Sequence, residues 1–211
     1  MKNIYNILNS SYLFSDVSIT VTERQGVVLG DSATITCAVT NVNNVPDSIT
    51  WSDSAGDISN NDFYTVTKSS TSSTLVVKSV SPSTLYAFTC TMAFGVSSFD
   101  IEAEISVYEF DVAGDAVLGI AGASVLIPCK FESNSSTGVS ATIQKSVNSV
   151  WTAQSDSIFS TSGNTTQGSL AIASADSSNE GKFRCSVTDS DGLTITSDPF
   201  NLDIFGKSSR S

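Results

Sequence analysis

The chain has 211 residues, of which 40% are hydrophobic and 15% charged, and its 21 acidic and 10 basic side chains give a formal net charge of −11 at pH 7. This charge argues strongly against binding to nucleic acid or to an anionic membrane surface. The chain contains no histidine, so the commonest general base and the commonest metal ligand are both absent. The length fits one large or two ordinary domains, and the composition predicts a folded chain.

Residues 1–16 precede the first regular pattern. Their lysine and apolar residues are typical of a secretion signal, although asparagines interrupt the apolar run. Two interpretations stay open, a weak leader or the start of a chain that lies inside a larger protein. Asn9 in this segment satisfies the glycosylation pattern Asn-x-Ser/Thr. No stretch is long and apolar enough to span a membrane, so we expect any membrane attachment to lie outside this sequence.

From residue 17 onwards, short alternating segments predict β-strands. In the first half of the chain they are residues 32–39, 48–53, 63–68, 74–79, 86–94 and 99–107. The segment 86–94 places Tyr86, Phe88 and Cys90 at every second position, which predicts a strand with one buried face. Serine and threonine are abundant and good helix formers are sparse, which favours β-structure with polar outer faces.

The pattern around Cys37 recurs around Cys129. A glycine stands seven positions before each of these cysteines and an isoleucine two positions before. Cys90 and Cys185 follow at similar separations, each with a phenylalanine two positions earlier. These matched offsets predict two copies of one domain, and strands between turn signals predict an all-β sandwich for each copy.

The four cysteines indicate disulfides. No pair has the Cys-x-x-Cys spacing of a zinc site or of a thioredoxin-like redox site. An even number of widely separated cysteines predicts two long-range disulfides, which persist in oxidising compartments.

The order Cys37, Trp51, Cys90 resembles the immunoglobulin superfamily, which has a cysteine on strand B, a tryptophan on strand C and a cysteine on strand F. The resemblance implies two tandem immunoglobulin-like β-sandwiches, each with one inter-sheet disulfide. It implies that Cys37 pairs with Cys90, that Cys129 pairs with Cys185, and that Trp51 packs on the first disulfide. We expect the domains at 17–109 and 110–205, followed by a disordered polar tail at 206–211.

The second copy departs from the family pattern at its centre. Ile143 stands at the tryptophan position, and Trp151 comes eight residues too late to replace it. Phe88 and Phe183 stand where the family usually has its corner tyrosine, so we expect both rings to pack in the core without the corner hydrogen bond. The short separations between the cysteines favour the intermediate or constant-2 type of domain.

No motif predicts catalysis, a cofactor or a metal site. No GxSxG motif is present, and without histidine a serine nucleophile needs a lysine or a carboxylate as its base. The segment DSDG at 189–192 lies between two strand patterns, where Asp-Gly indicates a hairpin turn and the spacing of a calcium loop is absent. We expect a protein that is not an enzyme and has no small-molecule substrate. Asn134 and Asn164 satisfy the glycosylation pattern in polar stretches.

Residues that face outward from the strands are candidates for binding a protein partner. They are Asp100, Glu102, Glu104, Lys182 and Arg184, together with Val96 at a glycine turn. One interpretation is that these charges confer solubility and block edge pairing. The other is a contact between two copies of the chain, acidic face against basic face.

The family resemblance implies an extracellular module of a cell-surface receptor or adhesion molecule that binds a protein ligand, either a different protein or a second copy of the chain. A secreted immune-type binding protein has the same domains. A structural module of an intracellular filament is less expected, because a complete set of paired cysteines does not suit a reducing cytosol.

Overall fold

The computed structural model describes residues 5–6, 18–21, 24–40, 45–81, 86–112, 114, 116–134, 139–190 and 192–206. All regular elements within these ranges are β-strands. A search of the same residues for a helix that could cross a membrane finds none. The chain divides into two compact units, Met1–Val107 and Tyr108–Ser211. Most of the expected leader and residues 207–211 of the expected tail lie outside the described residues.

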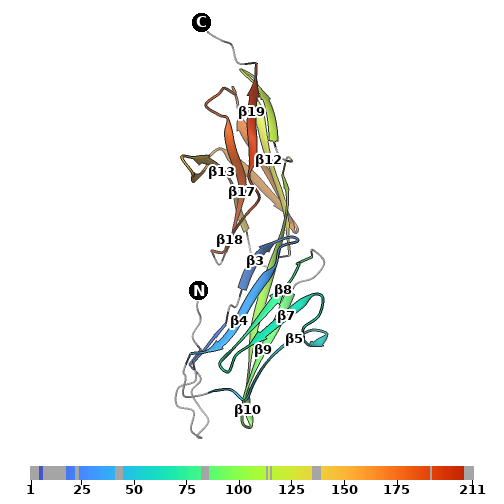
Figure 1. Cartoon of the computed structure of the whole chain (residues 1–211). Helices are drawn as coiled ribbons and strands as arrows, with labels where there is room; N and C mark the ends of the chain where they lie inside the picture. The colour runs from blue at the N-terminus through green and yellow to red at the C-terminus, as the bar shows by residue number, and fades with distance from the viewer. Residues whose placement is uncertain are drawn as a thin grey trace. The chain divides into compact units, whose positions relative to one another are not determined.

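Unit 1 is a sandwich of two sheets (Figure 1). One sheet has the strand order β1 (Tyr5–Asn6), β2 (Ser18–Val21), β4 (Ala33–Val39), β8 (Ser72–Val77) and β7 (Tyr64–Lys68). The other has the order β10 (Ser97–Val112), β9 (Tyr86–Phe94), β5 (Ser48–Asp53) and β6 (Gly56–Asp57), and β3 (Arg24–Val28) also pairs with β10. Alternating apolar and Ser/Thr residues along these strands give each sheet one buried face and one polar face.

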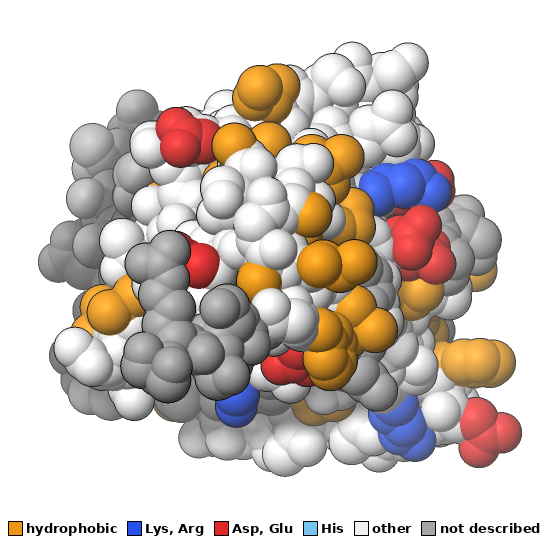
Figure 2. Space-filling model, turned by 90° about the horizontal axis from the view of Figure 1, so that it is seen from above, with side chains coloured by type: hydrophobic (Ala, Val, Ile, Leu, Met, Phe, Trp, Pro, Cys, Tyr) orange, Lys and Arg blue, Asp and Glu red, His pale blue; other side chains and the backbone are white. Residues whose placement is uncertain are grey.

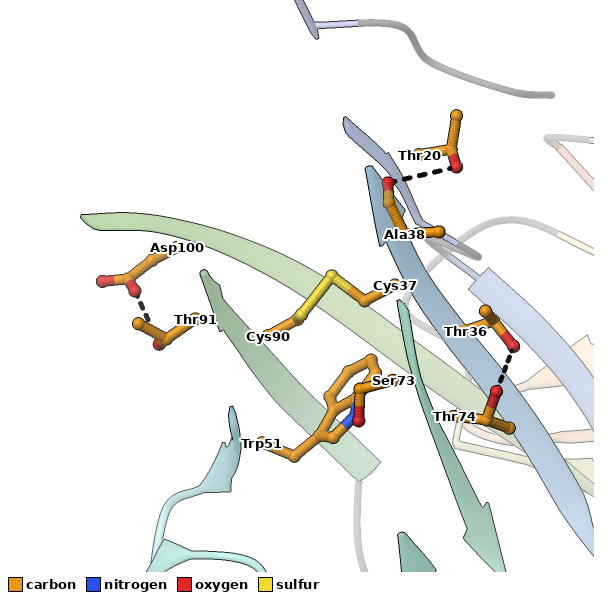
Figure 3. Close-up of a disulfide and its surroundings, with 10 residues drawn as sticks. All are labelled: Thr20, Thr36, Cys37, Ala38, Trp51, Ser73, Thr74, Cys90, Thr91 and Asp100. Atoms are coloured by element: carbon orange, nitrogen blue, oxygen red, sulfur yellow. Dashed lines mark hydrogen bonds between the residues drawn. A yellow bond between two sulfur atoms is a disulfide. The ribbon is translucent and has the colours of Figure 1, made fainter. Parts of the chain in front are cut away.

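The core of unit 1 lies around a disulfide between the two sheets. Cys37 of β4 is bonded to Cys90 of β9, and both cysteines are fully buried. Trp51 of β5 is 1% exposed, and its Nε1–H donates a 3.0 Å hydrogen bond to Oγ of Ser73 on β8. Figure 3 shows Trp51 and Ser73 beside the disulfide. Phe88 is also buried, as its position two residues before Cys90 implies.

Unit 2 repeats this architecture. One of its sheets has the order β10, β12 (Val125–Ser133), β16 (Thr165–Ile172) and β15 (Ser157–Ser162). The other has the order β11 (Ala116–Ile120), β19 (Phe200–Phe205), β17 (Gly181–Asp189), β13 (Val139–Val147) and β14 (Val150–Ala153), and β18 (Thr194–Thr196) also pairs with β17. Strand β10 pairs with β9 over Ser97–Ile105 and with β12 over Tyr108–Val112, so both the unit boundary and the boundary expected after residue 109 lie within it.

The core of unit 2 also contains a disulfide, between Cys129 of β12 and Cys185 of β17. Ile143 and Phe183 are buried in the same apolar cluster. Tyr108, Phe131 and Val187 form a further buried cluster within this unit. These observations confirm the expected fold class, two all-β sandwiches that each carry one inter-sheet disulfide.

Candidate recognition surfaces

The outer side of the β10–β9–β5 sheet in unit 1 carries a row of carboxylates, which we call the acidic face (Asp100, Glu102 and Glu104). Cα register places Asp100 opposite Thr91 and Glu102 opposite Thr89. The Thr91 hydroxyl donates a 2.7 Å hydrogen bond to Asp100 Oδ1, a contact drawn in Figure 3. Because Ala103 and Ile105 are buried on the opposite side of β10, the carboxylates face away from the core.

Val96 lies at the tip of the hairpin between β9 and β10. Phe94 is paired with Ser97, so Gly95 and Val96 form a two-residue turn. Gly95 has a φ of 60°, a backbone conformation that glycine adopts without strain. The Val96 side chain is fully exposed, with a relative exposure of 107%, whereas Phe94 is buried.

In unit 2, an arginine stacks on a tryptophan on the outer side of the β14–β13–β17–β19–β11 sheet, which we call the Trp151 face. Arg184 Cζ lies 4.3 Å from the centroid of the Trp151 ring. The Nε–H of the same guanidinium donates a 2.7 Å hydrogen bond to Gln144 Oε1. Partial burial lowers the pKa of the Arg184 guanidinium from its usual value, and the group stays charged at neutral pH. The three side chains are therefore held in one arrangement before any partner arrives.

The neighbouring strands extend the Trp151 face. Lys182 is exposed two residues before Arg184 and pairs in register with Asn201 of β19. At the β11 edge, exposed apolar side chains lie side by side, because Ile120 is in register with Phe205. Figure 2 shows hydrophobic side chains gathered on the upper surface of the chain, with acidic and basic side chains beside them. Apolar groups rimmed by charge are a common feature of protein-binding surfaces.

The hairpin between β13 and β14 carries Trp151 and has an unusual turn. Asn148 and Ser149 have φ values of 51° and 65°, the left-handed region that favours glycine. Both central residues of a type I′ turn need such angles, and the turn sets the register that places Trp151 opposite Ser146. Ser146 has the same parity as Gln144, so this register brings the indole to the outer face beside Arg184.

The remaining predicted sites lie in turns of unit 2 or outside the described residues. Asn164 is exposed in the two-residue turn between β15 and β16, and Asn134 is half-buried just after β12. Asn9 lies outside the described residues. In the segment predicted as a hairpin turn, the Gly192 N–H donates a hydrogen bond to the Asp189 carbonyl at 3.0 Å. A search of the described residues finds no cluster of acidic residues or cysteines suited to a metal ion.

Trp151 is a surface residue that the sequence pattern did not single out, since it was considered only as a tryptophan too late in the chain for the core. The signal was available in the segment Val147-Asn148-Ser149-Val150. A two-residue hairpin turn there fixes the parity of the following strand, and this parity places Trp151 on the same side as Gln144.

Comparison with known proteins identifies the first unit directly. Residues 18–93 match the model of a family described as immunoglobulin domain. No curated protein matches the chain.

Three solved structures illustrate the structural similarities. A titin fragment of three immunoglobulin domains is 16% identical, with a TM-score of 0.43 over 90% of this chain and 65% of that chain. The N-terminal Ig1-2 module of the Drosophila receptor protein tyrosine phosphatase DLAR is 21% identical, with a TM-score of 0.39 over 89% and 99%. Titin domains z1z2 in complex with telethonin are 16% identical, with a TM-score of 0.37 over 93% and 100%. This chain thus spans about two thirds of the first fragment, and these similarities carry no information about its function.

The family match and the two disulfide-linked sandwiches define the class of protein, a tandem of immunoglobulin-like domains. Residues 18–93 belong to the immunoglobulin domain family, and the second unit shares the immunoglobulin-like fold.

Proposed function

We propose that the chain is an extracellular recognition module, the ligand-binding part of a cell-surface receptor or adhesion molecule, and that it binds a protein partner through the Trp151 face. The observation that carries this proposal is the stack of Arg184 on Trp151, 4.3 Å from the ring centroid, on an open sheet surface. Tryptophan and arginine are the residues most enriched among those that dominate binding energy at protein interfaces.

The arrangement suits binding for two physical reasons. Gln144 and Trp151 hold the Arg184 side chain in place, so less side-chain entropy is lost when a partner docks. Arg184 and the exposed Lys182 also place two positive charges together on a chain whose formal net charge is −11. A local field of this sign favours a partner with an acidic patch and speeds its approach.

The two disulfides support the extracellular location. All four cysteines of the chain are paired, and such pairs persist outside the reducing cytosol. Mass spectrometry of the protein isolated from its natural source tests this part of the proposal. Intact disulfides are expected for a receptor module or a secreted binder, whereas four free thiols would refute the extracellular location and favour an intracellular filament.

A homophilic contact is a second candidate, supported by the charge spacing of the two faces. Asp100, Glu102 and Glu104 stand two residues apart on β10, as Lys182 and Arg184 do on β17. Neighbours of this kind lie about 7 Å apart along a strand, so the acidic face of one copy matches the cations of another in spacing and in sign. The net charge of −11 on each copy opposes the approach.

Charge reversal on the Trp151 face tests partner binding. Beads coated with the oxidised chain are applied to cells of the source organism before and after removal of surface proteins by protease. We expect protease-sensitive binding that is lost in Lys182→Glu/Arg184→Glu. The matched control Lys68→Glu/Lys78→Glu changes the net charge equally at exposed positions of unit 1 and should bind as the wild type does. Equal binding by the Lys182→Glu/Arg184→Glu chain would rule out this face.

Sedimentation over a concentration series tests whether the chain associates with itself. A dimer that weakens as salt rises and is absent in Lys182→Glu/Arg184→Glu would support a contact between the two charged faces. A monomer at every concentration would remove this candidate and leave a different protein as the partner.

A further inference from the structure

The outer side of the β10–β12–β16–β15 sheet, on the side of unit 2 opposite the Trp151 face, is hollowed into a groove. Its larger part has a volume of about 560 Å³ and is lined by Asp111, Pro128, Lys130, Ile158, Ser160 and Gln167, among others. A smaller part of about 250 Å³ continues beside Asp111 and Lys130 as far as Glu132. The groove therefore runs along β12 towards the end of that strand.

Both glycosylation patterns of unit 2 lie at this end of the groove. Asn164 occupies the turn between β15 and β16, where Ser162 pairs with Thr165. Its carbonyl accepts a 3.0 Å hydrogen bond from the N–H of Ser133, the residue that directly precedes Asn134. The contact joins two segments far apart in the sequence, and it places both asparagines where β12 and β16 meet.

The register of the strands gives the distance from Asn164 into the groove. Thr165, which follows Asn164, is paired with Glu132, and Gln167 is paired with Lys130. Ser169, one more step along, is paired with Pro128 and with Ile158. Each step of two residues along a strand covers about 7 Å. The whole groove therefore lies within about 14 Å, along the strands, of the pair formed by Thr165 and Glu132. A branched chain of sugars attached to Asn164 is long enough to lie along it.

The side chains of the groove suit a carbohydrate. Polar side chains line part of the groove, namely Asp111, Lys130, Ser160 and Gln167. Lys130 Nζ lies 3.4 Å from Asp111 Oδ2. Beside them lie Pro128 and Ile158, and the Ile158 side chain is 76% exposed. A sugar ring presents hydroxyl groups at its edge and C–H groups on its faces, so a surface with both kinds of group matches it.

We propose that this groove seats an N-linked glycan carried by Asn164 of the same chain. The exposed Asn164 accommodates a glycan in the folded state more readily than the half-buried Asn134. The bound glycan covers Ile158 and the polar side chains of the groove. It leaves the Trp151 face as the sheet surface of unit 2 that a partner can reach. The inference rests on the proposed extracellular function, because N-glycans are added to secreted chains.

The test measures how well the groove protects the glycan from cleavage by an endoglycosidase. The full chain is produced in eukaryotic cells behind an added secretion signal, so that the result does not depend on where the native protein resides. Glycopeptide mass spectrometry determines the occupancy of Asn164, and an endoglycosidase is then applied to the folded protein. Cleavage tracks the fraction of glycan that has left the groove, so we expect cleavage at Asn164 at least about tenfold slower in the folded than in the denatured chain.

Two variants distinguish seating from a general effect of folding. Ile158→Ser/Gln167→Ala alters the groove at exposed positions and should speed cleavage about tenfold towards the rate of the denatured chain. Thr194→Ala/Asn201→Ala alters exposed positions on the opposite sheet and should leave the rate unchanged. Fluorescence of Trp151, measured in a Trp51→Phe background, checks that unit 2 is folded in both variants.

Three results would overturn the proposal. The first is an unmodified Asn164 in the secreted chain. The second is equal cleavage of the wild type and the groove variant, which would mean that the glycan extends into solvent. The third is self-association of the glycosylated chain that Ile158→Ser/Gln167→Ala abolishes, which would make a second copy the occupant of the groove. Any of these leaves the proposed function standing, whereas free cysteines in the native protein refute that function independently.

Discussion

Ser73→Ala should destabilise unit 1 by about 1–3 kcal/mol, although it removes only one oxygen atom. In the folded protein Ser73 is 0% exposed and Trp51 is 1% exposed, and the Ser73 hydroxyl accepts the indole N–H at 3.0 Å. Alanine at position 73 leaves this N–H buried without its partner. The expected loss is therefore the desolvation cost of an unpaired donor, which exceeds the net gain from an ordinary hydrogen bond.

Urea unfolding followed by fluorescence measures this loss. The chain has two tryptophans, so in a Trp151→Phe background the signal comes from Trp51 and reports on unit 1 alone. Ser98→Ala, at an exposed position of β10, serves as the control and should change the free energy of unfolding by less than about 0.5 kcal/mol.

A second background separates the hydrogen bond from other effects of the substitution. With Trp51→Phe no indole N–H faces position 73, so Ser73→Ala should cost at least about 1 kcal/mol less by circular dichroism than it does in the wild type. A loss below about 0.5 kcal/mol in the wild type, or an equal loss in both backgrounds, would refute the reasoning.

Two further predictions concern unit 2, and both can be measured by thermal unfolding followed through Trp151 fluorescence in a Trp51→Phe background. Ser149→Gly should stabilise the unit by about 1 kcal/mol, because Ser149 has a φ of 65° in the turn of the β13–β14 hairpin; a lower melting temperature would contradict the type I′ assignment. Gly168→Ala should destabilise it by about 1–3 kcal/mol, because a Cβ there would overlap the carbonyl oxygen of Ile158 and come within 2.6 Å of the Phe159 ring. An unchanged melting temperature in Gly168→Ala would show that β15 moves away from the added Cβ without a loss of stability.

Much of the fold could be predicted from the sequence because the alternation of a strand is a local property. The two-residue period around Cys90 and Cys185 fixes which neighbours share the buried face, and the recurrence of the pattern indicates two copies of one sandwich. The same period turns Lys182 and Arg184 outward on either side of the buried Phe183. None of these inferences needs a knowledge of which strands pair.

Only the tertiary structure decides which outward residues meet. Trp151 reaches Arg184 because the turn at Asn148 and Ser149 sets the register of β14 against β13, and a shift of one residue would point the indole to the other face. Ser73 meets Trp51 across the two sheets, and Asn164 meets Ser133 where β16 pairs with β12. These contacts depend on register and on packing between strands far apart in the chain. The sequence thus determines the faces of each strand, and the pairing of strands determines the sites.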